Sequence, residues 1–212
     1  MSYRGRFIAV GIVILFNVIR YFYYHQYMGL PFEASFFILT AIFFAVAWVG
    51  GKQYDLVKFY AEKDPLTNTY NRRTVDIVFK KQAGICKMKN KKLGIVLIDL
   101  DDFKEVNDRL GHQKGDELLR CVADVIKMNA KKEDFLVRWG GDEFVHIIPD
   151  SKEDFHLDYI LKLKEDLSHA GIHLNISIKA SIGIAVYPDD GESFDVLIRK
   201  ADTSMYDMKR EK

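Results

Sequence analysis

Hydrophobic residues dominate the first fifty positions of this sequence and then fall into short periodic runs. Two nearly continuous apolar runs cover 7–24 and 36–51. Each approaches the roughly 20 residues that a helix needs to cross a bilayer. The second run has no charged residue, and the first has Arg20 near its far end, from which a long side chain can reach the membrane interface. The pattern predicts two transmembrane helices.

Basic residues around these runs predict their orientation. Arg4 and Arg6 precede the first run, Lys52 follows the second, and the connecting stretch contains no Lys or Arg. By the positive-inside rule both ends lie in the cytoplasm. Residues 1–51 are therefore expected to form a helical hairpin of a multi-pass protein in the cytoplasmic (inner) membrane. Two alternatives stay open: a cleaved signal peptide for the first run, and an apolar helical pair packed on the soluble domain.

The remaining chain shows alternating strand-like and helix-like patterns. Residues 52–63 are polar with apolar positions at helical spacing, which predicts a helical stalk before a domain at 64–212. Asn68 suits a left-handed position in the turn that follows. Helices are expected at about 72–82, 103–110, 114–129, 153–169 and 193–210, with Gly111 and Gly115 between the second and third, and strands at 93–100, 135–139, 143–148 and within 173–187.

Two of these strands are joined by a tight hairpin, so the sheet must be mixed rather than purely parallel. The pattern predicts an α/β fold with a ferredoxin-like core, in which helices flank a mixed central sheet. With 31 Lys and Arg against 30 Asp and Glu, the chain has no basic footprint that would indicate nucleic acid as a partner. Cys86 and Cys121 have neither metal-site spacing nor the number for a disulfide framework.

Acidic residues cluster where two apolar strands end. Asp99, Asp101 and Asp102 close the strand that begins near residue 93, and Asp142 and Glu143 stand in the hairpin turn. Carboxylates there destabilise the fold unless a divalent cation neutralises them. If the hairpin pairs beside the first strand, the acids meet and can hold Mg²⁺ while leaving positions for substrate phosphates. Strand alternation puts Asp99 and Asp101 on one side if the strand extends that far. Alternatively, the acids only cap helices and solvate turns.

These acids belong to a longer set of motifs. Gly-Gly-Asp-Glu-Phe at 140–144 resembles the signature of the GGDEF family of diguanylate cyclases. Four more blocks resemble family motifs in order, at 64–73 (with Asn68 where glycine is usual), 99–119, 181–188 and 201–209. Five ordered blocks are much more specific than one five-letter match. The resemblance covers 64–212 and implies a nucleotidyl-cyclase-type GGDEF domain, preceded here by two transmembrane helices and lying in the cytoplasm.

The resemblance implies a reaction as well as a fold. Family members condense two GTP into cyclic di-GMP and two pyrophosphates. Each domain holds one GTP, so catalysis requires a homodimer in which the 3′-hydroxyl of each nucleotide attacks the α-phosphate of the other. Mg²⁺ or Mn²⁺, expected at two ions per active site, polarises the α-phosphate and neutralises the leaving pyrophosphate.

Metal-binding and catalytic roles follow from the same resemblance. Asp99 and Asp142 correspond to metal ligands, and the backbone carbonyl of Leu100 assists them. Glu143 corresponds to a further metal ligand or to the group that helps to deprotonate the attacking hydroxyl. The implied catalytic pair is therefore Asp142 with Glu143.

The implied substrate site draws on other parts of the motifs. Gly140 and Gly141 are expected to allow close approach of the triphosphate and an unusual φ in the turn. Asn107 and Asp116 match the family's guanine-binding pair, since an amide and a carboxylate complement that base. The other substrate-binding candidates are Lys104 and Lys209, for phosphates, and Phe103. A solvated role for the lysines and a core role for the aromatic stay open.

The sequence also departs from the family pattern. Many members carry an inhibitory product-binding Arg-x-x-Asp, but here Lys131 stands in place of the arginine, with Asp134 retained. Lysine cannot form a bidentate fork, so this inhibitory site is degenerate and product inhibition is expected to be weak or absent. The usual Gly-Arg-Asn after Lys209 does not occur, which suggests either truncation or reduced triphosphate affinity.

Two other functions are alternatives to catalysis. One is a non-catalytic GGDEF module that binds GTP or cyclic di-GMP as a receptor or scaffold. It is disfavoured because Gly140, Gly141, Asp142 and Glu143 are all present. The other is a related cyclase or nucleotidyl transferase that uses another nucleotide, which the guanine-binding pair disfavours.

Overall fold

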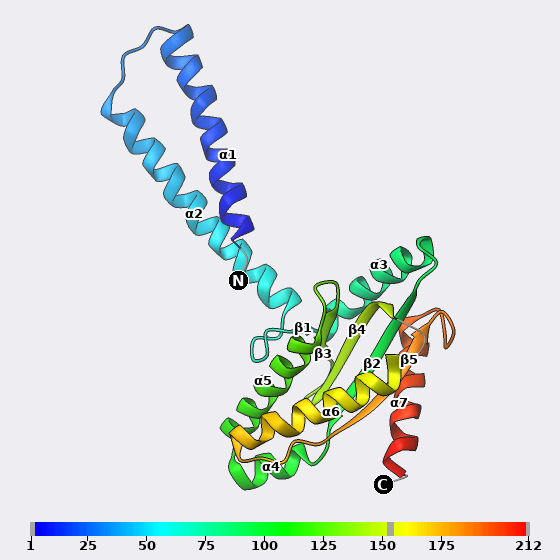
Figure 1. Ribbon diagram of the computed structural model, residues 1–212. Helices are drawn as coiled ribbons and strands as arrows, with labels where there is room; N and C mark the ends of the chain where they lie inside the picture. Colours follow the sequence, from blue (N-terminus) through cyan, green and yellow to red (C-terminus); the bar gives the residue numbers. More distant parts are fainter. Residues whose placement is uncertain (1–2, 152–154, 211–212) are drawn as a thin grey trace. The chain divides into compact units, whose positions relative to one another are not determined.

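The chain divides into two compact units, residues 1–61 and 62–212. The computed structural model describes residues 3–151 and 155–210. The first unit is a helical hairpin of α1 (Arg4–Tyr21), a π-helical turn η1 (Phe22–Tyr27) and α2 (Ala34–Glu62) (Figure 1). Both arms are long and apolar enough to cross a membrane, which alone is weak support for a membrane anchor. The helix α2 runs without a break through the segment expected to be a stalk.

Polar contacts join the two helices where the chain begins. The buried carboxylate of Asp55 accepts a 2.7 Å hydrogen bond from the backbone nitrogen of Gly5 and forms a 3.3 Å ion pair with Arg6. A Cβ on Gly51 would lie 2.6 Å from the Cα of Arg6, so only glycine lets the helix backbones approach this closely. Small residues therefore set the contact between the two helices at this end.

Arg20 joins the two helices near the connecting loop. Its guanidinium donates to the backbone oxygen of Phe36 at 2.6 Å and to Thr40 Oγ1 at 3.1 Å. The residue is 8% exposed, and its side chain is turned toward α2. The oxygens of α2 offer partners that an apolar surface does not.

A five-stranded sheet forms the centre of the second unit, in the order β1-β3-β4-β2-β5. The strands are β1 (Tyr70–Asn71), β2 (Lys92–Leu100), β3 (Phe135–Arg138), β4 (Glu143–Ser151) and β5 (Ala180–Tyr187). The strand β1 is parallel to β3, and the other neighbours are antiparallel. The mixed sheet is thus confirmed, and β2 to β5 have the connectivity and order of a ferredoxin-like core.

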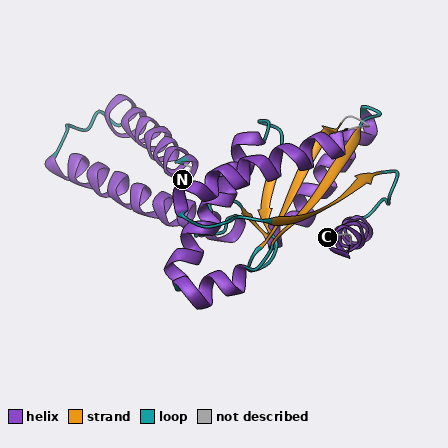
Figure 2. Cartoon of the chain, turned by 60° about the horizontal axis from the view of Figure 1, so that its bottom comes forward, coloured by secondary structure: helices purple, strands orange, loops and turns teal. Residues whose placement is uncertain are grey.

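Helices cover both faces of this sheet (Figure 2). They are α3 (Val75–Met88) after a 3-10 turn η2 (Arg72–Thr74), α4 (Phe103–Leu110), α5 (His112–Asn129), α6 (Phe155–Leu174) and α7 (Phe194–Arg210). One buried cluster joins Val96 and Ile98 of β2 to α5 and α6. A second joins Ile95 and Leu97 to α3 and α7. Alternation along a strand buried on both faces explains why β2 reads as a continuous apolar run.

Several predicted boundaries are wrong, including the end of the helix expected at 72–82, which continues as α3 to Met88, and one turn is confirmed. Asn68 is left-handed as expected, with φ 55°. Gly111, at φ 83°, separates α4 from α5, whereas Gly115 is buried inside α5. The helix α6 continues to Leu174, so the last strand begins at Ala180 and not near 173. Packing against the sheet extends this helix beyond its local signal.

Candidate active site

Strand pairing brings the two acidic clusters together. In the antiparallel ladder of β2 and β4, Asp99 lies opposite Glu143. The backbone nitrogen of Leu100 lies 3.3 Å from the backbone oxygen of Asp142. The hairpin therefore pairs beside β2, as the sequence predicted. This register places three carboxyl-bearing residues at one end of the sheet.

The hairpin turn is closed by backbone hydrogen bonds to the oxygen of Glu143, from Trp139 at 2.8 Å and from Gly140 at 3.3 Å. Neither Gly140 nor Gly141 has a positive φ, so the expected unusual backbone angle is wrong. A Cβ on Gly140 would lie 2.3 Å from Oε2 of Glu143, whereas a Cβ on Gly141 would meet no atom within 4 Å. Glycine at 140 leaves room for the protein's own carboxylate, and Gly141 faces open space.

An arginine beside the turn holds it to the start of the domain. Arg138 donates through Nη2 to the backbone oxygen of Gly141 at 2.7 Å, and its Nη1 lies 3.3 Å from both carboxylate oxygens of Asp64. Burial acts to raise the pKa of Asp64, but hydrogen bonds from Thr67 and the charge of Arg138 outweigh it, and the pKa lies below its ordinary value. Sequence reasoning missed this tether, although both residues lie in or beside motif blocks.

An open depression of 590 Å³ lies beside the paired acids. It is lined by residues 99–104 together with Asp142, Lys179 and Ser181. Five of the predicted site residues thus share one surface: Asp99, Leu100, Phe103, Lys104 and Asp142. Lys179 and Ser181 were not anticipated as site residues. Ser181 heads a motif block, which was the available signal, whereas Lys179 had none.

Glu143 is half-buried among like charges. Burial, then the carboxylates of Asp99, Asp142 and Asp202, raise its pKa above the ordinary value, and Arg72 opposes them. Mutual repulsion of this kind is relieved by a cation. Sequence reasoning had not placed Asp202 or Arg72 near the acids, because they come from α7 and from the turn before α3.

The donors suit a hard divalent cation only in part. Within the residues that the structure describes, no three Asp, Glu, His or Cys side chains form a ready-made metal cluster. Because β2 ends at Leu100, strand alternation does not extend to Asp101, which accepts a 2.6 Å hydrogen bond from Ser181. The side chains of Asp99 and Asp142 and the carbonyl of Leu100 remain as oxygen donors. One or two carboxylates with substrate phosphates are the usual set for Mg²⁺.

The predicted guanine-binding residues lie on the helices α4 and α5, outside that lining. A Cβ on Gly115 would lie 1.9 Å from Oδ1 of Asn107 and 3.3 Å from the ring of Phe103. Glycine at position 115 therefore lets the Asn107 amide lie against α5. Gly115 directly precedes Asp116 in the chain. Phe103 also packs on the core, which agrees with its alternative structural role.

The predicted inhibitory-site residues do not share one surface. The Lys131 side chain is exposed, while that of Asp134 is 4% exposed. Oδ2 of Asp134 accepts the Lys131 backbone N–H at 2.8 Å and lies 3.4 Å from Nε2 of buried His146. Burial and the charge of Asp134 raise the pKa of Tyr159, whose hydroxyl lies 2.7 Å from Nδ1 of His146. The side chain of the last predicted residue, Lys209 on α7, is outside the described residues.

Comparison with known proteins assigns the family. The family model for the diguanylate cyclase GGDEF domain matches residues 61–212. The chain belongs to the GGDEF family. This GGDEF domain is 31% identical over 151 residues to the diguanylate cyclase DosC of Escherichia coli. It is 35% identical over 155 residues to the cyclic di-GMP phosphodiesterase NbdA of Pseudomonas aeruginosa.

Solved structures agree with the fold. The GGDEF domain of DgcB from Caulobacter crescentus, in complex with c-di-GMP, matches with a TM-score of 0.64 and 28% identity. The match covers 71% of this chain and 89% of that one. The matches to DosC and NbdA cover 69% and 70% of this chain, but only 33% and 19% of those proteins. The similarity therefore concerns the GGDEF domain and not the whole relatives.

Proposed function

We propose that this protein is a diguanylate cyclase that condenses two GTP into cyclic di-GMP and two pyrophosphates. One observation carries the proposal: the β2–β4 register sets Asp99 opposite Glu143, beside a depression that Asp142 and Lys104 also line. Acids at that edge and a lysine beside them suit a triphosphate with its cation. Similarity to the diguanylate cyclase DosC supports the same activity, and similarity to the DgcB domain, which was solved with c-di-GMP, supports binding of that nucleotide.

Each residue has a role in this proposal. Asp99, Asp142 and the Leu100 carbonyl would hold Mg²⁺ or Mn²⁺, which supplies positive charge to the α-phosphate and to the leaving pyrophosphate. Glu143 takes the proton of the attacking 3′-hydroxyl as a general base. Lys104 orients the phosphates as a point charge.

Guanine selection belongs to a separate part of the site. Asn107 and Asp116 would bind the base through their amide and carboxylate groups. A base without the complementary donors and acceptors would leave these groups unpaired, which is strongly unfavourable. The proposal therefore includes preference for GTP over ATP. Lys209 would add a phosphate contact from α7.

The proposed assembly is a membrane-anchored homodimer. Residues 1–51 would cross the inner membrane twice, and 52–63 would lead to the catalytic domain at 64–212 in the cytoplasm. A single domain binds one GTP, so two copies must face each other for the exchange of attacks. The basic residues that flank the apolar runs support this orientation.

The test is turnover by the purified protein with Mg²⁺ and GTP or ATP, with products separated by chromatography. We expect cyclic di-GMP from GTP only, and its loss in Asp142→Ala. The exposed Asp124→Ala on α5 is the matched control, because it removes the same charge from a residue that does not line the depression. Turnover that survives in Asp142→Ala would refute the assignment.

A second function is carried by the similarity to NbdA, which is named as a phosphodiesterase and not as a cyclase. Similarity alone therefore does not separate a cyclase from a module that binds a nucleotide without turnover. The same assay separates the two, because tight GTP binding by equilibrium dialysis without product would favour the module.

Weak product inhibition is the last part of the proposal. Lys131 lacks the planar fork of arginine, and the Asp134 carboxylate is directed inward to His146. Turnover should therefore be unchanged by micromolar cyclic di-GMP. Strong inhibition that disappears in Lys131→Ala would contradict this.

A further inference from the structure

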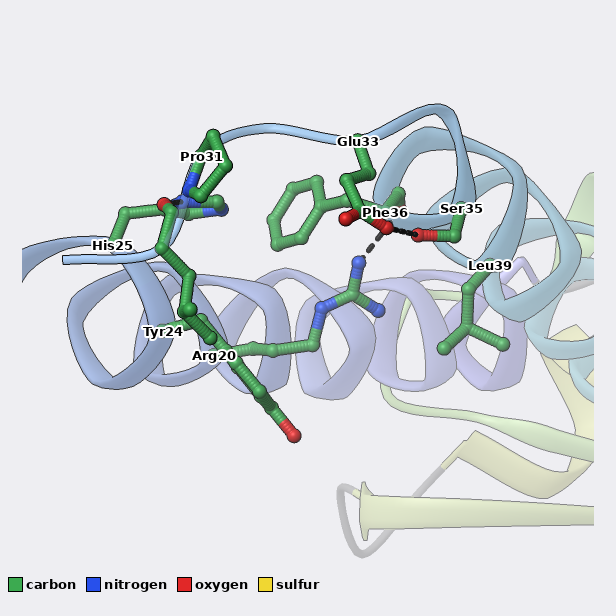
Figure 3. Close-up of a pocket in the computed structure, with 9 residues that line it drawn as sticks. Arg20, Tyr24, His25, Pro31, Glu33, Ser35, Phe36 and Leu39 are labelled. Carbon is green, nitrogen blue, oxygen red and sulfur yellow. Dashed lines mark hydrogen bonds between the residues drawn. The ribbon is translucent and has the colours of Figure 1, made fainter. Parts of the chain in front are cut away.

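A pocket of 330 Å³ lies within the helical hairpin, at the loop between its two arms (Figure 3). We call it the hairpin pocket. Its polar wall includes Arg20, His25 and Glu33, and its apolar wall includes Leu30, Phe36 and Leu39. The volume is in the range of small-molecule sites. The proposed cyclase reaction uses none of these residues.

The buried guanidinium of Arg20 lacks a counter-charge. Its two hydrogen-bond acceptors, the Phe36 backbone oxygen and Thr40 Oγ1, are neutral, and the Phe36 ring lies 3.9 Å from its central carbon. Nη1 is buried and has no hydrogen-bond partner in the part of the chain that the structure describes. A buried charge that is only partly hydrogen-bonded is destabilising unless an anion pairs with it. An anionic group beside Nη1 of Arg20 would supply the missing partner.

A second nitrogen in the pocket requires a hydrogen-bond donor. Nδ1 of His25 lies 2.6 Å from the backbone oxygen of Leu30, and because a carbonyl only accepts, Nδ1 carries the proton. In the neutral ring Nε2 is then an acceptor. This Nε2 is buried, and no described residue pairs with it. The ring is held in place by stacking on Phe32, with centroids 3.6 Å apart.

Glu33 gives the pocket a negative side opposite in charge to Arg20. Figure 3 shows the Arg20 side chain extending from α1 toward Glu33, Ser35 and Phe36 at the start of α2. No ion pair between Arg20 and Glu33 occurs in the described structure, so both charges remain available to a ligand. The pocket thus combines a cation, a carboxylate, a neutral acceptor and an apolar wall.

We propose that the hairpin pocket binds a zwitterionic ligand with a primary amine. Its anionic group pairs with Arg20, its ammonium donates to Nε2 of His25 and to Glu33, and its apolar part packs on Phe36 and Leu39. A free α-amino acid with an aliphatic side chain has this chemistry. So does the headgroup of phosphatidylethanolamine, whose phosphate and ammonium carry the same two charges.

The pocket joins the end of α1 to the beginning of α2, the helix that ends at Glu62 where the GGDEF unit begins. In the proposed topology, the ligand is bound on the side of the membrane opposite to the GGDEF domain. The binding claim itself does not depend on cyclase activity. Ligand binding and cyclase activity are measured in separate assays, so failure of the binding proposal can be distinguished from failure of the proposed cyclase function.

The test uses the full chain in phosphatidylcholine nanodiscs, because choline has no N–H to donate. Calorimetric titration compares L-leucine with 4-methylpentanoate, which lacks the amine, and with 3-methylbutylamine, which lacks the carboxylate. Leucine should bind at least about tenfold more tightly than either, since each lacks one charge-assisted contact. A parallel arm uses nanodiscs that contain phosphatidylethanolamine, with retained lipid detected by native mass spectrometry.

Three variants identify the residues. Arg20→Gln should weaken leucine binding at least about tenfold, and Glu33→Gln should remove the advantage of leucine over 4-methylpentanoate. Glu33 is exposed, so this variant tests the proposal even if Arg20→Gln does not fold. Arg4→Gln removes the same charge from an exposed position at the other end of α1 and should change nothing.

The outcomes are distinct. Leucine binding that depends on Glu33 identifies a free amino acid as the source. Retention of phosphatidylethanolamine that Glu33→Gln abolishes, without leucine binding, identifies the lipid. The proposal is overturned if neither ligand binds, if 4-methylpentanoate binds as tightly as leucine, or if folded Arg20→Gln binds either ligand like the wild type.

Discussion

Alanine substitutions at Gly140 and Gly141 distinguish two reasons for glycine in the hairpin turn. Gly140 leaves space for the Glu143 side chain, whereas Gly141 faces open space that a substrate can occupy. In Gly140→Ala the new Cβ would lie 2.3 Å from Oε2 of Glu143 and 3.1 Å from its Cδ. The three nearest atoms all belong to that flexible side chain, and the φ of Gly140 is not positive. The backbone can therefore accept alanine, and the Glu143 carboxylate must move.

The size of the effect follows from that distance. An ordinary contact requires the carboxylate to retreat by about 1 Å, and a displacement of about 1 Å at a catalytic group lowers the rate by about 100-fold. The expected kcat of Gly140→Ala is therefore about 100-fold lower, or about 2.7 kcal/mol in the barrier. Its folding free energy should change by less than about 1 kcal/mol, as for alanine at a compatible φ.

Gly141→Ala is the matched control, because its Cβ would meet no protein atom within 4 Å. If the triphosphate passes over this turn, Gly141→Ala should raise KM for GTP with little change in kcat. Steady-state kinetics and chemical denaturation of both variants supply the measurements. A Gly140→Ala enzyme with wild-type kcat would refute the catalytic importance of the Glu143 position, and one that unfolds would refute the packing argument.

Three other predictions concern stability, each measured by chemical denaturation in detergent. Gly183→Ala should lower the free energy of unfolding by about 3 kcal/mol, because its Cβ would lie 1.9 Å from the backbone oxygen of Ala201; an unchanged midpoint would contradict this. Arg138→Met and Asp64→Asn should couple by about 1–2 kcal/mol at pH 7. Because the pKa of Asp64 lies below its ordinary value, the coupling energy should be lost as the pH falls through that pKa. A coupling energy that is the same in acid as at pH 7 would disprove the tether. Glu143→Gln should stabilise the ion-free protein at neutral pH, since burial and nearby carboxylates raise the Glu143 pKa and so disfavour its ionised form in the folded state. This gain in stability should disappear as the pH is lowered toward 4.5, the ordinary pKa of a Glu carboxyl, and also when Mg²⁺ is added. If Glu143→Gln is not more stable than the wild type at neutral pH, the repulsion within the acid cluster is refuted.

Local signals in the sequence were sufficient for most elements of the fold. The run that became β2 is apolar throughout because the strand is buried on both faces. Asn68 marked a left-handed turn and Gly111 marked a break between two helices, each through its own backbone preferences. These features depend on a residue and its near neighbours, so they can be read without the fold.

Boundaries that depend on packing were not predictable in this way. Gly115 looked like a helix break, but it is buried within α5, where the missing side chain leaves space for Asn107 of α4. Likewise, α6 extends to Leu174 because the core covers it. In both places the partner that stabilises the helix comes from another element, and the local sequence does not contain it.

The candidate site divides in the same way. By itself, the sequence determined which acids, glycines and lysines are present, how they are spaced and which family they resemble. Only the tertiary structure decided that Asp99 faces Glu143, that Arg138 joins the turn to Asp64, and that the Arg20 side chain turns into the helical hairpin. The reason is physical: periodicity and backbone preference act over a few residues, whereas strand register, charge pairing and burial join segments far apart in the chain.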